Sequence, residues 1–299
     1  MQQSPDLKIA LVGDSVLDDH YWLEHPADDV RAQTERTLKL AYPDRPVEVH
    51  NYAVDESTVA CVLYGRAPAA AFMKARKKAL MAPYPLEEDG LVKPLLLLRK
   101  LKPTHVVLSV GGNDARVRFL QSLNPDVITD LMVTDGLVAN LRRVIEFIRA
   151  EVTPNIILVY VFMPEFKVCP WLSLLPPARI LQHLLVNFSK FYIKLAVEFS
   201  LPIIDLSRTF DPNNKSHYGS TPIEPSNKSG QFIADLIAEQ VVERFEFGGA
   251  PGGAKIFSGV GAEFKVEDLG DEAGFSYERQ LQAFFNRKKA QKTTSCCIG

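Results

Sequence analysis

Five short apolar runs recur along the chain, separated by longer stretches in which apolar residues follow a helical spacing. The runs cover residues 7–12, 47–51, 105–110, 155–162 and 202–206. Runs of this kind are typical of parallel strands that are buried on both faces. The helical stretches cover residues 27–41, 57–80, 91–101, 125–151, 176–199 and 228–245. This alternation predicts an α/β fold, a three-layer sandwich in which helices cover both faces of a five-stranded, mostly parallel sheet.

The first apolar run ends in Gly13, Asp14 and Ser15. A glycine allows a sharp turn out of the strand, and the short side chains after it leave Ser15 open at the carboxyl end of the strand. Ligands bind at this edge of an open α/β sheet, so a nucleophile is well placed there. A second interpretation is that Asp14 or Ser15 only caps the following helix. The polar residues at the other strand ends favour the first interpretation.

Polar residues also follow three other runs. The second run ends in Asn51 and leads into residues 53–58, the third is followed by Gly-Gly-Asn-Asp at 111–114, and the fifth leads to Asp205. Parallel topology brings these ends to one rim of the sheet. A serine nucleophile needs donors for the oxyanion that forms on the carbonyl, and the Asn113 amide and the backbone N–H groups of Ser15 and Glu56 suit that role. The alternative for residues 111–113 is a turn that needs positive φ angles.

These segments resemble the sequence blocks of the SGNH (GDSL-like) hydrolases, a family of esterases, lipases and carbohydrate-ester hydrolases. Residues 13–19 are similar to the first block, and Ser15 takes the place of the family's nucleophile. Residues 51–58 resemble the second block, with Glu56 where the family has a glycine whose N–H helps to form the oxyanion hole. Asn113 takes the place of the oxyanion-hole asparagine of the third block. The resemblance implies a flavodoxin-like SGNH hydrolase fold and serine-dependent hydrolysis of carboxylic esters.

The last block departs from the family pattern. The family has an Asp-x-x-His pair just before a helix, as orienting acid and general base, whereas alignment on the helix that begins near Lys228 places Thr221 and Glu224 there. A glutamate with its ordinary pKa of about 4.3 is a weak base toward a hydroxyl group unless burial raises that pKa. His217, in the preceding loop, is the second candidate for the base. The alternative is that His217 is a solvated loop residue without a catalytic role. If neither acts, the alternative is a catalytically impaired binding or scaffold protein of the same fold that has lost the catalytic His/Asp pair.

Composition narrows the choice of partners. The chain has 299 residues, of which 46% are hydrophobic and 23% charged, and a formal net charge of −2. These values are typical of a globular protein and argue against nucleic-acid binding by phosphate neutralisation, so a small-molecule, lipid or carbohydrate ester is the expected partner. The four cysteines have neither metal-ligand nor disulfide spacing, and no phosphate-binding glycine loop follows the first strand. We therefore expect no cofactor, no metal and a cytoplasmic, reducing environment.

The composition changes near residue 247. We predict one SGNH-type esterase domain over residues 7–247, followed at 248–299 by a glycine-rich linker and a basic extension that ends in a cysteine pair. Cys296 and Cys297 follow a basic stretch and resemble a lipidation site. A lipid there, with the basic stretch as a second signal, would associate the protein peripherally with a membrane.

Two further segments bear on the site. The apolar, proline-containing residues 164–175 follow the fourth run and are expected to pack beside or over the site. Five basic residues cluster on the helix after the second block, namely Arg66, Lys74, Arg76, Lys77 and Lys78. A solvated helix face explains such a cluster, and attraction of an anionic ligand is the alternative.

Overall fold

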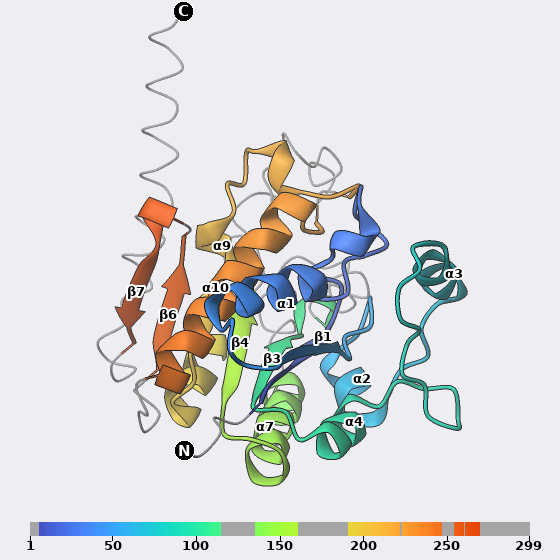
Figure 1. Ribbon diagram of the computed structural model, residues 1–299. Helices are drawn as coiled ribbons and strands as arrows, with labels where there is room; N and C mark the ends of the chain where they lie inside the picture. Colours follow the sequence, from blue (N-terminus) through green and yellow to red (C-terminus); the bar gives the residue numbers. More distant parts are fainter. Residues whose placement is uncertain are drawn as a thin grey trace, which may run out of the picture.

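A seven-stranded sheet forms the centre of the computed structural model, which describes residues 6–114, 135–160, 191–221, 223–246, 254–259 and 261–269 (Figure 1). The strands lie in the order β2-β1-β3-β4-β5-β6-β7. They are β1 (Leu7–Gly13), β2 (Val47–Asn51), β3 (His105–Ser109), β4 (Ile156–Tyr160), β5 (Ile203–Asp205), β6 (Lys255–Ser258) and β7 (Lys265–Asp268). All neighbouring strands are parallel except β6 and β7. The predicted α/β fold with a mostly parallel sheet is confirmed.

Helices cover both faces of the sheet. One layer consists of α1 (Val30–Ala41) and α10 (Asn227–Glu246), which lie in front of the sheet in Figure 1. The other consists of α2 (Val59–Tyr64), α4 (Pro94–Leu101), α7 (Asp135–Glu151) and the helical residues 191–199. Along β1, Leu7, Ile9 and Leu11 pack toward the first layer, and Ala10 and Val12 toward the second. Because both faces of β1 are buried, its sequence is continuously apolar instead of alternating.

Short helical turns complete the described elements. They are η1 (Pro26–Asp28), α9 (Leu206–Thr209), η3 (Lys215–His217) and η4 (Gly261–Glu263). The N-terminus of α1 is capped by Asp29, whose carboxylate accepts a hydrogen bond from the Ala32 N–H over 2.8 Å. This cap explains why the predicted helix over 27–41 begins at Val30, after the separate turn η1.

The predicted helix over residues 57–80 is divided in two. Helix α2 ends at Tyr64, and α3 (Ala70–Lys78) begins only after a break. Gly65 has a φ angle of 96°, which favours glycine, and Pro68 cannot continue a helix. As a result α3 runs separately and stands apart from the sheet in Figure 1, although its residues contact the segment that follows β1.

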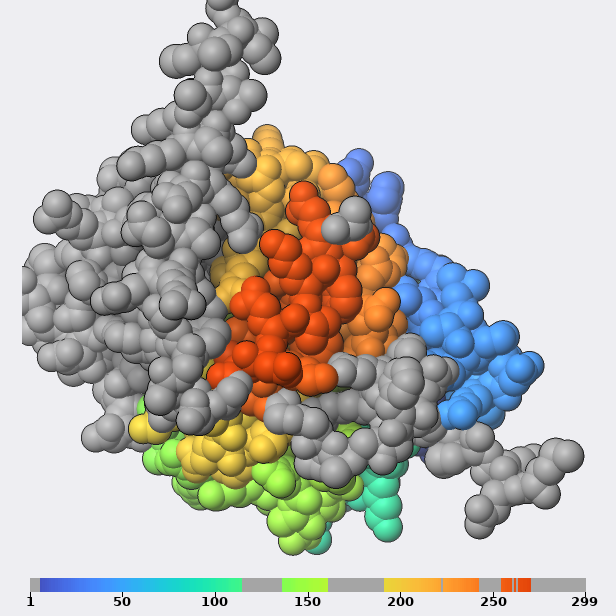
Figure 2. Space-filling view, turned by 90° about the vertical axis from the view of Figure 1, so that its left-hand side faces the viewer, coloured from blue at the N-terminus to red at the C-terminus, as the bar shows by residue number. Residues whose placement is uncertain are grey.

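The sheet has two strands more than the five that we expected. Strand β6 pairs parallel with β5, and β7 pairs antiparallel with β6. Both come from residues beyond 247, where the sequence indicated a linker and an extension. Ile256 and Phe257 are buried under the sheet's helical layers, whereas the side chains of β7 are exposed and mostly charged, which protects an edge strand from pairing with another chain. Figure 2 shows this hairpin in red at the surface, beside α10 in orange.

Several predictions concern residues outside the described ranges. They are the packing of residues 164–175, the basic extension, and the lipidation of Cys296 and Cys297. These stay predictions. Within the described residues, no helix has both the length and the apolar character that a membrane span requires.

Gly13 closes β1 at the point where the backbone of β3 approaches it most closely. A Cβ atom on Gly13 would lie 1.7 Å from the Ser109 carbonyl oxygen, and the φ angle of 146° also disfavours other residues. Gly13→Ala should therefore lower the free energy of unfolding by roughly 3 kcal/mol or more. Gly90→Ala is the control, because Gly90 also has a positive φ, 74°, but a Cβ there would have no atom within 4 Å. Its cost should be about 1–2 kcal/mol. Denaturant unfolding measures both, and equal losses would contradict the steric argument.

Candidate active site

The segment that follows β1 is hydrogen-bonded to the segment that follows β2. The Val54 N–H donates to the Gly13 carbonyl oxygen over 3.1 Å, and the Asp55 N–H donates to the Asp18 carboxylate over 2.9 Å. Parallel strands bring their carboxyl ends together, and these bonds then hold the emerging chain segments in contact. The segments that carry the predicted nucleophile and the predicted backbone donor are therefore neighbours.

The segment after β3 contacts both of the others. The Asp14 N–H donates to the Ser109 carbonyl oxygen over 3.0 Å, and Nδ2 of Asn113 donates to the Ser57 carbonyl oxygen over 3.1 Å. A primary amide carries two N–H donors, so the bond to Ser57 orients the Asn113 side chain and leaves its second donor for another acceptor. Hydrogen bonds thus join all three segments that resemble family blocks.

Ser15 lies in the turn that leaves β1. This turn is held by Asp14, whose carbonyl oxygen accepts from the Leu17 N–H over 3.1 Å and from the Asp18 N–H over 3.0 Å. Ser15 and Asn113 each expose 8% of their surface. Among the described residues, none forms a hydrogen bond with the Ser15 hydroxyl.

Glu56 has a left-handed backbone conformation, with φ at 62°. Glycine adopts this conformation easily and other residues do so rarely, which fits the glycine that the resemblance implies at this position. The Arg66 guanidinium donates to the Glu56 carboxylate over 2.6 Å and to its carbonyl oxygen over 3.1 Å. Glu56 therefore has a carboxylate side chain where a glycine has only a hydrogen atom, and Arg66 binds this carboxylate.

Two carboxyl groups in these segments have raised pKa values. Burial, together with the neighbouring carboxylates of Asp55 and Asp114, raises the pKa of Asp14 to about 7. Burial also raises the pKa of Asp55 to about 6, against the opposing effects of hydrogen bonds from the Trp22 indole and the Glu56 N–H. A substantial fraction of Asp14 is therefore protonated at neutral pH.

The Asp18 carboxylate is fully buried and accepts four hydrogen bonds from described residues. The donors are the Tyr84 hydroxyl over 2.6 Å, the Asp55 N–H over 2.9 Å, the Arg76 guanidinium over 3.0 Å and the His20 ring over 3.1 Å. Burial alone would raise the pKa of Asp18, but the hydrogen bond from His20 and the charge of Arg76 hold it below its usual value. The network joins the segments after β1 and β2 to α3 and to the chain that follows it.

The five basic residues that were expected to cluster on one helix have different surroundings. Arg76 is buried in α3 against Asp18, its guanidinium carbon 4.1 Å from the centre of the Tyr84 ring. Arg66 lies before α3 and binds Glu56. Lys74, Lys77 and Lys78 are the exposed members of the set. The solvated-face interpretation therefore applies to the lysines and is wrong for Arg76.

The His217 ring forms a hydrogen bond and two aromatic contacts with nearby residues. Its Nδ1 accepts a hydrogen bond from the Asp211 N–H over 2.9 Å, and the ring packs edge-on against Phe210 and Phe232. Burial lowers the pKa of His217, and the nearby charge of Lys228 lowers it further, against the opposing charge of Asp211. No described contact joins this ring to the predicted nucleophile. These contacts indicate that His217 stabilises its own loop.

Glu224 and Thr221 lie in the loop between η3 and α10. Glu224 is buried, with 4% of its surface exposed, and its carbonyl oxygen accepts from the Gly219 N–H over 2.9 Å. The Ser220 N–H donates to the Trp22 carbonyl oxygen over 2.9 Å, which attaches this loop to the segment that follows the first block. Thr221 supplies a hydroxyl group where the family has its orienting carboxylate.

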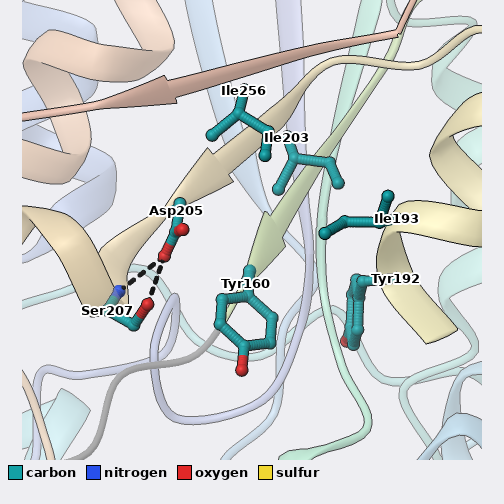
Figure 3. A pocket seen from close by; sticks show the side chains of 7 residues that line it. All are labelled: Tyr160, Tyr192, Ile193, Ile203, Asp205, Ser207 and Ile256. Atoms are coloured by element: carbon teal, nitrogen blue, oxygen red, sulfur yellow. Dashed lines mark hydrogen bonds between the residues drawn. The ribbon is translucent and has the colours of Figure 1, made fainter. Parts of the chain in front are cut away.

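A small cavity of about 30 Å³ lies at the carboxyl ends of β4 and β5 (Figure 3). Tyr160 and Asp205 line it from these strands, and Tyr192 from a neighbouring helix. The Tyr192 hydroxyl donates to the Val110 carbonyl oxygen, and burial raises its pKa well above the usual value. The Asp205 carboxylate accepts from the N–H and the hydroxyl of Ser207, as the dashed lines show. The cavity has room for about one water molecule and is too small for an ester substrate.

Comparison with solved structures finds enzymes of the same architecture. The lipase Lip_vut3 from a goat rumen metagenome superposes with a TM-score of 0.52 at 12% identity, over 78% of this chain and 97% of that one. A lipase/acylhydrolase from Enterococcus faecalis gives 0.48 at 19% identity, over 80% and 96%. An acetyl xylan esterase from Geobacillus stearothermophilus gives 0.49 at 17% identity, over 83% and 98%. No family model and no curated protein matches the chain.

The chain shares the α/β fold of the lipase Lip_vut3, and the predicted architecture is confirmed. Because one fold supports many functions, these similarities concern the architecture alone. The reaction depends on the residues of the site.

The sequence pattern did not predict the supporting role of several residues around the site. They are Asp18 with its partners Arg76 and Tyr84, Arg66, and Tyr192. The pair Asp18-Asp19 directly after an apolar strand was a usable signal, because a carboxylate that becomes buried requires donors. Arg76 also follows the apolar Phe72 by one helical turn, which places both on the same face of α3. The other two had no local signal, because their partners come from other elements.

The raised pKa of Asp14 predicts a pH-dependent stability. The unfolded chain releases this proton near 3.8 and the folded protein only near 7, so unfolding becomes easier as the pH rises between these values. The cost above pH 7 is at most on the order of 4 kcal/mol, at about 1.4 kcal/mol per pKa unit. Asp14→Asn cannot ionise, so it should raise Tm relative to wild type at pH 8 and have a much smaller effect at pH 4. Asp44→Asn, at an exposed position, is the control. A Tm difference for Asp14→Asn that does not change with pH would contradict this prediction.

Proposed function

We propose that the protein is a serine-dependent hydrolase of carboxylic esters. Ser15 attacks the ester carbonyl carbon, and Asn113 together with the backbone N–H groups of Ser15 and Glu56 binds the oxyanion. The proton of the Ser15 hydroxyl passes to a base and then to the departing alcohol. Water attacks the resulting acyl-enzyme, releases the acid and regenerates Ser15.

The observation that carries this proposal is the hydrogen-bonded junction of the three strand-end segments. The bond from Asn113 to the Ser57 carbonyl oxygen supports it most directly, because it orients the amide beside Ser57, and its second N–H has no partner among the described residues. Donors that are fixed before the reaction stabilise a developing negative charge more effectively than donors that must reorient. A Ser15 hydroxyl without a hydrogen bond to any described residue agrees with the role of nucleophile.

Glu224 is the base that the surroundings favour. It is buried, and its loop is hydrogen-bonded to the segment that follows the first block. His217 is the weaker candidate, because its Nδ1 already accepts the Asp211 N–H and its ring is enclosed by aromatic side chains. With Thr221 in place of an aspartate, no carboxylate stands at the family's orienting position.

The structural relatives indicate the class of substrate. Their names describe a lipase, a lipase/acylhydrolase and an acetyl xylan esterase. These names agree with an ester in a lipid or in an acetylated carbohydrate as the substrate. We expect the same bond to be cleaved here, and the alcohol part to be the property that differs between candidate substrates.

A fluorophosphonate probe tests the nucleophile. Wild type should be labelled at Ser15, and Ser15→Ala should lose both labelling and turnover with an almost unchanged Tm. Asn113→Ala should lower kcat by about 10²–10³, the effect of removing one oxyanion donor. Mass spectrometry locates the label, and steady-state kinetics with a panel of acetyl and longer acyl esters gives kcat. Wild-type kcat in Asn113→Ala would refute its role.

Two substitutions separate the candidate bases. Glu224→Gln should approach the inactivity of Ser15→Ala, because a nucleophile and its base act as a unit. His217→Gln should retain most of the wild-type kcat and lower Tm, since the ring binds the Asp211 N–H of its own loop and packs against Phe232 of α10. The reverse result would assign the base to His217. In that case kcat/KM would rise through a pKa below the ordinary histidine value of about 6.5.

A catalytically impaired binding protein of the same fold is the second candidate. Thr221 in place of the orienting aspartate and the enclosed ring of His217 favour it. A folded wild-type protein that is neither labelled nor active on the ester panel would establish this alternative.

A further inference from the structure

Glu56 combines an unfavourable backbone conformation with an unusual side-chain contact. It has a φ of 62°, although it carries a Cβ and a charged side chain. The preceding residue is fixed from two sides, because the Asp55 N–H donates to Asp18 and the Asp55 carboxylate accepts from the Trp22 indole over 2.9 Å. The following residue is fixed by the bond from Asn113 to the Ser57 carbonyl oxygen. Glu56 therefore stands between two immobilised peptide groups.

Arg66 is the residue that holds Glu56 itself. One guanidinium nitrogen donates to the Glu56 carbonyl oxygen over 3.1 Å, and the other donates to its carboxylate over 2.6 Å. The planar fork of a guanidinium group can make both bonds at once, whereas a lysine ammonium carries no such fixed fork. The two bonds link the backbone and the side chain of Glu56 to one rigid group.

The position of Arg66 is itself fixed by the backbone. The Arg66 N–H donates to the Val92 carbonyl oxygen over 3.0 Å, and the Val92 N–H donates back over 2.8 Å. The preceding Gly65 has a φ of 96°, and a Cβ there would lie 2.9 Å from Cγ of Lys93. The chain thus turns sharply after α2 and pairs with the segment before α4, which presents Arg66 to Glu56.

We infer that Arg66 is a positioning residue that compensates for the absence of a glycine at position 56. It maintains the left-handed conformation that directs the Glu56 N–H, and it neutralises the carboxylate that this substitution brings to the site. The inference rests on the proposed function for its catalytic consequence, because the Glu56 N–H is one of the three oxyanion donors. Without Arg66, the backbone can relax toward a negative φ, and a free carboxylate lies close to a reaction that develops negative charge.

A double-substitution cycle tests this inference. Arg66→Ala should lower kcat by about 10-fold to 100-fold with little change in KM, because a displaced donor weakens binding of the transition state. In the Glu56→Gly background, glycine adopts the required φ by itself and no carboxylate remains. Arg66→Ala should then change kcat by less than about threefold. Arg66→Lys in the otherwise wild-type chain should lie between wild type and Arg66→Ala.

Arg142→Ala is the matched control, since Arg142 binds the Glu198 carboxylate through two nitrogens, over 2.9 and 2.7 Å, at a position away from the candidate site. It should leave kcat unchanged. Equal losses of kcat from Arg66→Ala in the wild-type and Glu56→Gly backgrounds would overturn the inference, because Arg66 would then act independently of Glu56.

The Tm values of the four proteins in the cycle separate this inference from the proposed function. Arg66→Ala should lower Tm more in the wild-type background than in the Glu56→Gly background, whether or not the protein hydrolyses esters. An inactive, unlabelled wild type with this Tm pattern would refute the hydrolase and leave Arg66 as the group that holds Glu56. Equal changes of Tm in both backgrounds would refute the role of Arg66 itself.

Discussion

The buried carboxylate of Asp18 is the interaction on which the surroundings of the candidate site depend. A carboxylate in the interior is stable only when donors replace the water that it has lost, and here an arginine, a tyrosine, a histidine and a backbone N–H do so. These donors come from three separate stretches of chain. Removing one partner would leave a buried charge without compensation, which is far more costly than losing a pair at the surface. The segments around Ser15 are therefore held by an electrostatic requirement as well as by packing.

The parallel sheet supplies the second constraint, because it determines where the functional segments leave the core. Strands β1 and β3 approach each other so closely at their carboxyl ends that only glycine fits at position 13. The chain leaves this point as a tight turn that carries Ser15, and the ends of β2 and β3 add Glu56 and Asn113 to the same edge. Such an edge collects polar groups from distant parts of a sequence without any of them being neighbours along the chain.

Two glutamates give the candidate site its particular character. Glu56 occupies the position of a glycine and Glu224 the position of a histidine in the pattern that the sequence resembles. Glu56 adds an acidic group beside Asp55, and burial raises the pKa values of Asp14 and Asp55 to about 7 and about 6. In a buried region, several carboxyl groups cannot all be ionised at low cost. The protonation of Asp14 and Asp55 therefore changes near neutral pH.

The sequence by itself determined the strands β1 to β5, their parallel arrangement and the strand-end positions of Ser15 and Asn113, because apolar runs and the residues that end them are local signals. The sequence pattern did not predict the strands β6 and β7, because each is only four residues long and they follow a glycine-rich stretch. Sequence spacing could not reveal that Arg66 binds Glu56, that Arg76 is buried against Asp18, or that aromatic side chains enclose His217. These contacts were decided by the tertiary structure, since the charge, burial and donors around a side chain depend on which distant elements pack against it.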